Sequence, residues 1–236
     1  MIRFKNVSKS FGIANVLDDI SFDIQKGECV AITGESGSGK STLIHMLIGA
    51  ARPSNGAVQI DNFHIERLST DNLQLFRRSI GVVFQDFKLL EKKTVFENVA
   101  FALEALDETD EEIYVRTNSA ISKVGLQGKE HRFPHELSGG EKQRTAIARA
   151  IVHNPHVIIA DEPTGNLDQK NSLEVINLLK KLNQDGITVI IATHSNEVLD
   201  ILKPRIITIK NHKITETRQK PHISTVKKIN LKELTK

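Results

Sequence analysis

Short apolar runs recur along this chain and mark its expected strands. Near the N-terminus, residues 2–7 and 16–24 alternate apolar and polar side chains on either side of Gly12, a pattern that predicts two antiparallel strands. Compact apolar runs farther along the chain predict strands at 29–33, 57–60, 80–84, 157–160, 187–192 and 205–209.

Helical patterns fill the stretches between these runs. They predict helices over 42–48, much of 95–125, 140–153, 171–184 and 196–202. The acidic cluster at 107–112 contains Thr109-Asp-Glu-Glu112, a capping-box pattern, so we interpret it as the start of a helix rather than as a binding patch. Strands interleaved with helices predict an α/β fold with a largely parallel sheet.

Composition limits the class of protein. A chain of 236 residues can bury one sizeable core, and 39% hydrophobic with 26% charged residues is typical of a soluble globular protein. We find neither an apolar run near the ~20 residues of a membrane span nor a signal peptide. Cys29 is the only cysteine, which excludes a disulfide within the chain. We therefore expect a cytoplasmic protein.

Charge is distributed unevenly along the sequence. Residues 218–236 hold six basic side chains and one acidic side chain, whereas residues 1–217 hold 26 basic and 28 acidic side chains. The body of the protein is therefore not expected to bind nucleic acid. The basic tail suits contact with anionic lipid headgroups or a partner, and it equally suits a solvated chain end.

A glycine-rich loop after the apolar run at 29–33 predicts a phosphate site. It reads Gly34-Glu-Ser-Gly-Ser-Gly-Lys40-Ser41, and its glycines allow successive amides to curl around phosphate oxygens. Lys40 would neutralise phosphate charge and the Ser41 hydroxyl would ligate Mg²⁺. A chance match in a chain of this length is on the order of one per cent. The predicted site comprises Gly34, Glu35, Ser36, Gly37, Ser38, Gly39, Lys40, Ser41 and Thr42.

A second motif region lies between residues 137 and 168. A glycine pair after Ser138 opens a predicted helix, and such a helix start can present N–H groups to an anion. The apolar run at 157–160 ends in Asp161-Glu162. One of these carboxylates suits binding of a hydrated Mg²⁺, and the other suits a hydrogen bond with a water molecule. Together with the glycine-rich loop, these groups predict hydrolysis of a nucleoside triphosphate.

The set of motifs resembles the nucleotide-binding subunit of ATP-binding-cassette (ABC) systems, over roughly residues 1–217. Each element of the family has a counterpart here in the same order. They are the Walker A loop at 34–41, the Q-loop at Gln85, the signature at 137–141, Walker B at 157–162, the D-loop at 166–168 and the switch histidine at His194. The signature ends in Glu141, where the family more often has glutamine.

The resemblance implies a domain organisation. It predicts a P-loop NTPase core of ABC type over 1–217, with a mostly parallel sheet and an N-terminal antiparallel β-subdomain. A helical subdomain at about 87–155 would be inserted within that core, and the basic tail would occupy 218–236.

The resemblance also implies roles for individual residues. Ser41 and Asp161 would hold Mg²⁺, with Gln85 as a further ligand or a water-positioning group. Glu162 would polarise the attacking water, and His194 would contact the γ-phosphate. Taken alone, Glu162 could be a helix-capping acid and His194 a structural histidine at a strand end. Their place in the complete set favours the chemical roles, and the complete set argues against a non-catalytic scaffold.

Two further groups of contacts follow from the resemblance. Phe11 matches the aromatic position that stacks on adenine, although it could also be an ordinary core or edge-strand residue. Ser138, Gly139, Gly140 and Glu141 would contact ATP held by an opposite subunit, with Asp168 in the D-loop. The implied active form is a homodimer with ATP bound between its subunits.

Within the family, residues 76–103 resemble the cell-division branch, and residues 161–168 resemble a broader group that includes lipoprotein-release and macrolide-export ATPases. The cell-division branch implies an integral membrane partner, a place on the inner face of the cell membrane and control of cell-wall hydrolysis. The partner would touch residues 86–106, where Phe87 and Phe96 could serve the contact or pack the helical lobe.

Two alternatives to the cell-division function would involve other partners. The first is the ATPase subunit of a transporter for lipoprotein release, efflux or import, whose chemistry would be identical. The second is a DNA-associated ABC ATPase, which carries a long coiled-coil insertion before the signature. Only 97 residues separate Ser41 from Ser138, and they show no sustained heptads, which argues against this second alternative.

Overall fold

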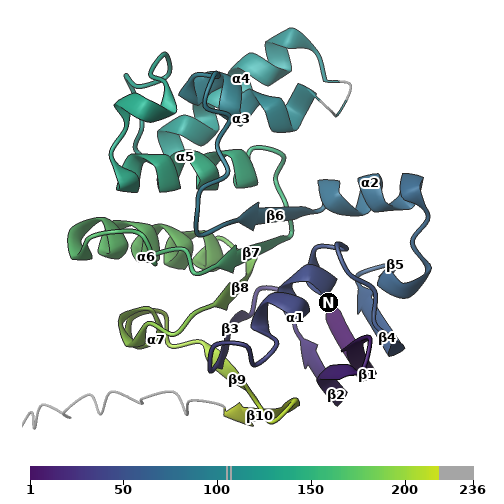
Figure 1. The fold of residues 1–236 in the computed structure, drawn as a ribbon. Coiled ribbons are helices and arrows are strands. Elements are labelled where there is room, and N and C mark those ends of the chain that lie inside the picture. The colour runs from purple at the N-terminus through teal and green to yellow at the C-terminus, as the bar shows by residue number, and fades with distance from the viewer. Residues whose placement is uncertain (105, 107, 218–236) are drawn as a thin grey trace, which may run out of the picture.

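Two β-sheets and a group of helices make up the described part of the chain (Figure 1). The computed structural model describes residues 1–104, 106 and 108–217. The predicted basic tail at 218–236 and one member of the acidic cluster, Asp107, lie outside the described residues.

The first sheet is antiparallel and includes the N-terminal strands. Its order is β2-β1-β4-β5, with β1 at Ile2–Phe11, β2 at Ala14–Ile24, β4 at Asn55–Ile60 and β5 at Phe63–His64. The β1–β2 ladder runs from the pair Ile2 and Ile24 to the pair Phe11 and Ala14. The antiparallel pairing that the alternating pattern predicted is therefore confirmed.

The second sheet has the order β10-β9-β3-β8-β7-β6 and positions the candidate site. Neighbouring strands are parallel except for β10, which is antiparallel to β9. This arrangement confirms the predicted α/β class. The strands are β3 at Cys29–Gly34, β6 at Ile80–Val83, β7 at Val157–Asp161, β8 at Thr188–Ala192, β9 at Arg205–Lys210 and β10 at Lys213–Thr217.

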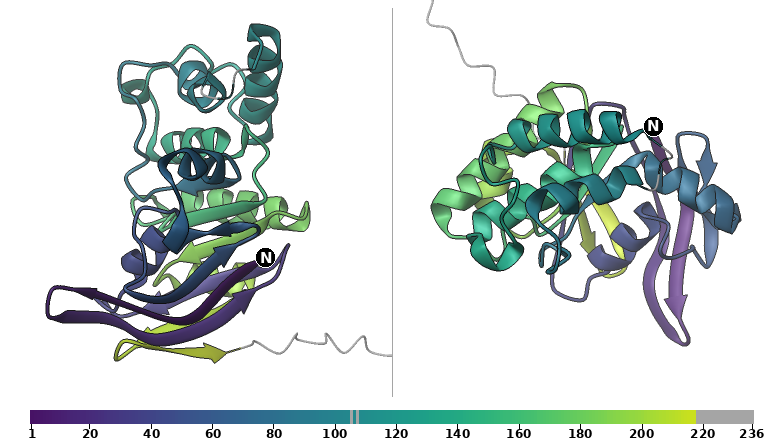
Figure 2. Two further views of the ribbon diagram at one scale, coloured as in Figure 1. Left: turned by 90° about the vertical axis from the view of Figure 1, so that its right-hand side faces the viewer. Right: turned by 90° about the horizontal axis from the view of Figure 1, so that it is seen from above.

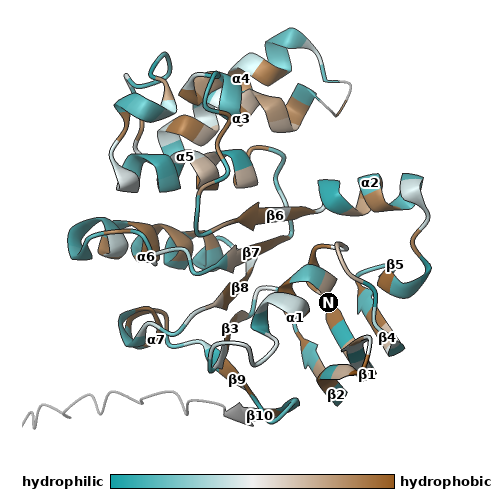
Figure 3. Cartoon of the chain, in the orientation of Figure 1, coloured by the Kyte–Doolittle hydropathy of each residue, from teal (hydrophilic) through white to brown (hydrophobic). Residues whose placement is uncertain are grey.

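Both faces of the parallel sheet are buried, which explains its continuous apolar runs (Figure 3). Alternate residues of one strand enter different cores. Ile159 on β7 and Ile190 on β8 belong to the cluster shared with the antiparallel sheet. Ile158 and Ile191 belong to the cluster on the opposite face. Cys29 at the start of β3 packs against this second cluster, and burial raises the pKa of its thiol to about 11.

The helices occupy the connections between strands. Three of them, α3, α4 and α5, lie together at the end of the molecule opposite the β1–β2 hairpin (Figure 2). The helix bounds are α1 at Lys40–Leu47, α2 at Thr70–Arg78, α3 at Val95–Glu104, α4 at Asp110–Lys123, α5 at Gly139–Ile151, α6 at Gln169–Gln184 and α7 at Asn196–Leu202, with 3₁₀ turns at Ile65–Arg67 and Pro134–Glu136.

Thr109 caps α4 with the predicted capping box, because its side chain accepts from the Glu112 amide while the Glu112 carboxylate accepts from the Thr109 amide. No helix in the described ranges combines the length and apolar character that a membrane span requires.

The sequence patterns did not predict helix α2 or the short strands β5 and β10. Helix α2 is largely polar and so lacks a dense apolar run, and it begins after Ser69, whose side chain accepts from the amide of Asn72. Strand β10 is short and follows a tight turn in which Asn211 and His212 have φ of 49° and 64°. Positive φ at both central residues is the geometry of a two-residue hairpin turn.

Candidate functional site

Four adjacent strands, β3, β8, β7 and β6, bring most of the sequence-predicted residues to one edge of the sheet. Because these strands are parallel, their carboxyl ends meet at that edge. The glycine-rich loop follows β3, and His194 follows β8. Asp161 and Glu162 lie at the end of β7, and Gln85 follows β6.

The glycine-rich loop has the backbone that its sequence predicts. Gly37 and Gly39 adopt φ of 77° and 109°, and a Cβ atom on Gly34 would lie 2.6 Å from the Ile209 carbonyl oxygen. The Lys40 ammonium group donates to the carbonyl oxygens of Gly34 and Glu35 at 2.8 and 3.0 Å.

Helix α1 begins directly after this loop at Lys40. Within the described residues, no side chain caps its first turn. Its leading N–H groups and dipole therefore face the loop, an arrangement that suits an anion such as phosphate.

Asp161 lies at the sheet edge close to Lys40. Burial raises the pKa of its carboxyl group, and the neighbouring Glu162 carboxylate raises it further, while the charges of His45 and Lys40 act in the opposite direction. A carboxylate in this environment binds a cation favourably, because a cation offsets the cost of keeping the charge buried.

Glu162 and His194 form a close pair. The Glu162 carboxylate oxygen Oε1 lies 2.7 Å from Nδ1 of His194, and only 14% of the Glu162 side chain is exposed, against 78% for His194. Glu162 also has a φ of 45°, unusual for a residue other than glycine. Its amide donates to the Ala192 carbonyl at 2.9 Å, which fixes this backbone to the end of β8.

Thr193 is a contact of this pair that sequence reasoning missed. It is fully buried, and its hydroxyl donates to Oε2 of Glu162 at 3.2 Å while accepting from the Ser195 amide at 3.0 Å. The available signal was a hydroxyl directly before His194, at the end of an otherwise apolar strand. Both carboxylate oxygens of Glu162 therefore have a partner.

The Q-loop and the D-loop lie side by side. The Asn166 amide group donates to the Gln85 carbonyl oxygen at 2.9 Å, and a Cβ atom on Gly165 would lie 2.9 Å from the Gln85 amide nitrogen. Asp168 caps α6 by accepting from the amide and side chain of Asn171 at 2.8 and 2.7 Å, and the Asn171 amide lowers the pKa of Asp168.

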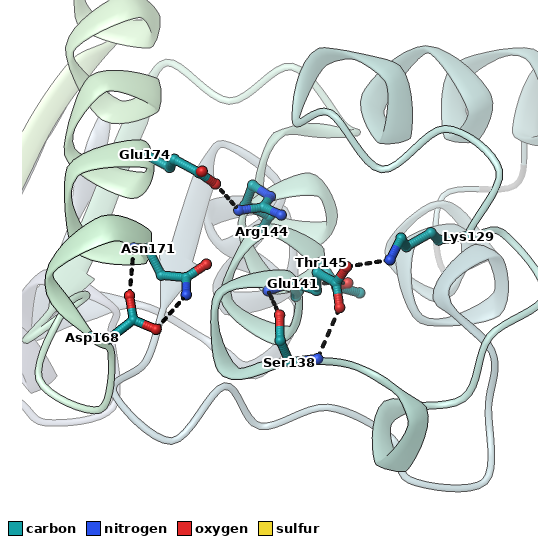
Figure 4. A network of polar contacts seen from close by, with 8 residues as sticks. All are labelled: Lys129, Ser138, Glu141, Arg144, Thr145, Asp168, Asn171 and Glu174. Carbon is teal, nitrogen blue, oxygen red and sulfur yellow. Dashed lines mark hydrogen bonds and ion pairs between the residues drawn. The ribbon is translucent and has the colours of Figure 1, made fainter.

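The signature residues lie against the D-loop rather than the glycine-rich loop of the same chain. Ser138 caps α5 with a capping box completed by Glu141, and Lys129 pairs with the Glu141 carboxylate (Figure 4). A Cβ atom on Gly140 would lie 1.8 Å from the Asn171 side-chain oxygen, and one on Gly139 would contact Leu167 at 3.4 Å.

Phe11 ends β1 next to the hairpin turn, and 56% of it is exposed. The Lys9 ammonium group lies 4.8 Å from its ring centroid. Farther along the hairpin, Val16 and Leu17 pack so closely on Gly39 that a Cβ atom there would lie 3.1–3.2 Å from them. The hairpin that bears Phe11 therefore adjoins the glycine-rich loop.

Comparison with known proteins identifies the class. Residues 17–165 match the family model described as ABC transporter. The chain belongs to this family, and it is an ATP-binding, ATP-hydrolysing subunit.

Its relatives include several proteins named cell division ATP-binding protein FtsE. The FtsE of Streptococcus pneumoniae serotype 2 (strain D39) is 44% identical over 221 residues, 93% of this chain and 96% of the relative. That of Bacillus subtilis (strain 168) is 46% identical over 213 residues, 89% of this chain and 93% of the relative. That of Escherichia coli (strain K12) is 42% identical over 212 residues, 89% and 96% of the two chains.

A solved structure supports the fold independently. The chain is similar to a chain of the solved structure of the ATP-binding cassette MJ0796, which was determined as a dimer in a post-hydrolysis state bound to ADP and Pi. The TM-score is 0.84 at 37% identity, covering 93% of this chain and 99% of that chain. The predicted ABC fold and the predicted resemblance to the cell-division branch are both confirmed.

Proposed function

We propose that this chain is the ATPase subunit of a membrane complex of the FtsE–FtsX type, in which ATP-driven dimerisation controls cell-wall hydrolysis during cell division. The identity of 42–46% with FtsE proteins, over about nine-tenths of the chain, supports the cell-division role. The proposed hydrolysis of ATP is supported by one observation: the glycine-rich loop and the Glu162–His194 pair lie at the same edge of the sheet.

For the reaction, we propose that residues 34–42 bind the phosphates of ATP and that Phe11 supports the adenine. Lys40, which now donates to loop carbonyls, would turn to the β- and γ-phosphates. Glu162 would accept a hydrogen bond from the attacking water, and His194 would contact the γ-phosphate. The products are ADP and inorganic phosphate.

The proposed cofactor is Mg²⁺, with Ser41, Asp161 and Gln85 as its residues. They supply a hydroxyl, a carboxylate and a side-chain amide oxygen, the hard donors that Mg²⁺ prefers. The raised pKa of Asp161 fits this role, because the carboxylate then lies where a positive charge is favourable. Bound Mg²⁺ would neutralise charge on the phosphates.

The position of the signature supports a homodimer in the ATP-bound state. Gly139 and Gly140 lie against Leu167 and Asn171 of the D-loop helix region in their own chain. We propose that they, with Ser138, Glu141 and Asp168, meet the nucleotide of a second subunit. The dimeric state of the MJ0796 cassette supports this assignment.

The proposed integral membrane partner docks at the segment after Gln85. Arg149 on α5 donates to the carbonyl oxygens of Phe87 and Lys88 at 2.9 and 2.7 Å, which fixes two residues of positive φ. Phe87 and Phe96 are both half-buried, but Phe96 packs on the helical core, and its ring centroid lies 5.9 Å from that of Tyr114. We therefore assign partner contact to Phe87 and lobe packing to Phe96.

A cavity of about 380 Å³ lies near the amino end of β6, between α2 and the end of α3. It is lined by Gln74, Arg77, Arg78, Ala102, Leu106 and His153. Docking of the partner on the segment after Gln85 would hold the chain at the inner face of the cell membrane. We also propose that the helical region at about 87–155 is a subdomain inserted in the ATPase domain of residues 1–217.

The test uses Glu162→Gln, which retains the side-chain shape and removes the charge. ATP binding should persist, while steady-state hydrolysis should fall by about 10²–10⁴-fold, the usual contribution of a general base. Unchanged turnover would exclude Glu162 as the key carboxylate.

The same variant identifies the partner. Tagged Glu162→Gln protein would be captured with ATP from detergent-solubilised membranes of its own host. Recovery of one small membrane protein with a large extracytoplasmic loop would support the cell-division complex. Recovery of permease subunits with a solute- or lipoprotein-binding companion would instead show that the chain is a transport ATPase. Residues 161–168 resemble those of transport ATPases as well.

A further inference from the structure

The carboxylate of Glu141 is held in a fixed position at the start of the signature helix. Its Oε2 accepts from the Ser138 amide at 2.8 Å, and its Oε1 pairs with the Lys129 ammonium group (Figure 4). The Glu141 side chain is 15% exposed. The hydrogen bond from Lys129 is the main cause that lowers the pKa of Glu141, so this carboxylate is ionised at neutral pH.

An ionised carboxylate at this position conflicts with the proposed trans contact. Glu141 directly follows the three residues that would meet the γ-phosphate of a second subunit, and it replaces the glutamine that is common in the family. A negative charge at close range to a polyphosphate repels it, and partial burial increases the repulsion.

Lys129 is placed to cancel this charge. Its backbone is held between α4 and α5, because its amide donates to the Leu126 carbonyl at 3.1 Å and its carbonyl accepts from the Arg132 amide at 3.0 Å. Nearby Arg132 pairs with Glu136 at 2.9 Å, so its charge is directed to another carboxylate.

The opposite side of α5 is fixed by different contacts. Arg144 pairs with Glu174 on α6 at 2.5 Å, and Gly140 packs directly on Asn171. The capping box between Ser138 and Glu141 does not involve Lys129. Removal of the Lys129 charge therefore leaves several contacts that hold the helix start in place.

We propose that Lys129 is a positioning and charge-compensating residue of the signature: it neutralises Glu141, so that the start of α5 can approach the ATP held by a second copy of this chain. This role rests on the proposed ATP-bound homodimer. Glutamate at the last signature position is then compatible with ATP because a lysine 12 residues earlier accompanies it.

The test measures ATP-driven dimerisation by sedimentation velocity, with full-length protein in the Glu162→Gln background. Lys129→Met should raise the ATP concentration for half-maximal dimerisation about tenfold. Glu141→Gln should lower it about two- to threefold, since Lys129 is then uncompensated. The double variant Lys129→Met/Glu141→Gln should return to within about twofold of the parent.

A charge mechanism also predicts salt dependence. The tenfold effect of Lys129→Met should shrink as the salt concentration rises to about 0.5 M, because salt screens the repulsion. Lys123→Met is the matched control, since it removes the same charge from the helical region at the last turn of α4. It should leave dimerisation unchanged. Thermal melting verifies that each variant is folded.

Three outcomes would overturn the proposal. These are dimerisation of Lys129→Met at the parent ATP concentration, a double variant as impaired as Lys129→Met, and a defect that persists at high salt. In each case the parent dimer, and with it the proposed function, would stand. A Glu162→Gln parent that fails to dimerise with ATP would instead refute the proposed homodimer, and the role of Lys129 with it.

Discussion

At the scale of single residues, Glu162 combines an unfavourable backbone with a fully engaged side chain. A φ of 45° in a non-glycine residue costs on the order of 1–3 kcal/mol and persists where surrounding contacts fix it. Here the contacts are the Ala192 carbonyl, the Thr193 hydroxyl and the His194 ring. The carboxylate is thus oriented without ATP, which would favour the proposed catalytic role of Glu162 by positioning.

The hydroxyl of Thr193 should matter for turnover. Thr193→Val keeps the shape of the buried side chain but removes the hydrogen bond to Glu162, so kcat for ATP should fall about tenfold with little change in KM. Steady-state ATPase assays check this. Thr193→Ser is the matched control and should keep most of the activity. Wild-type kcat in a folded Thr193→Val protein would contradict the positioning role.

At the scale of elements, Asn98 ties the loop after β6 to helix α3. It is fully buried, and its side chain accepts from the Leu90 amide at 2.8 Å and donates to the carbonyls of Leu90, Lys93 and Thr94 at 2.9–3.1 Å. These bonds fix the chain between the Q-loop and the helical region without regular secondary structure.

Loss of these bonds should destabilise the protein. Asn98→Leu leaves buried backbone groups without partners, so the free energy of unfolding should fall by about 2–4 kcal/mol. Urea denaturation measures it. Asn118→Leu, which removes a single bond to the Tyr114 carbonyl within α4, should cost less than about 1 kcal/mol. Equal losses in the two variants would show that the loop does not depend on Asn98.

Sequence patterns predicted elements better than they predicted contacts between elements. Strands with dense apolar runs were located because burial on both faces requires them, and six motifs in order led to the loops at the sheet edge. Helix α2 escaped prediction because its composition is largely polar and it contains no dense apolar run. Thr193, Lys129 and Asn171 escaped because their roles depend on pairs across neighbouring elements, which spacing along the chain does not specify.

At the scale of the whole molecule, His153 links the end of the helical group to the first residue of strand β6. Its ring nitrogen Nε2 lies 3.1 Å from the Ile80 carbonyl oxygen, and Nδ1 is buried without a partner among the described residues. Burial lowers the pKa of His153, the hydrogen bond with the Ile80 carbonyl acts in the opposite direction, and the charge of Arg116 lowers the pKa further. The folded protein therefore favours the neutral ring.

This lowered pKa predicts a dependence of stability on pH. Protonation favours the unfolded state, whose histidine pKa is about 6.5, so the contribution of His153 is complete above that pH and declines as pH falls towards the folded pKa. Urea denaturation at pH 7.5 and 5.5 should show a smaller loss of stability in His153→Gln than in the wild type. Equal losses in both proteins would contradict the assignment.

The half-buried thiol of Cys29 has a practical consequence for spectroscopy. With a pKa of about 11, only about one thiol in ten thousand is a thiolate at pH 7, and the thiolate is the species that reacts with maleimides and other labels. Cys29 is the sole cysteine of the chain. A cysteine introduced at an exposed position can therefore take a fluorophore or spin label selectively while the native Cys29 stays in place, and paired labels on two subunits would report their approach in real time.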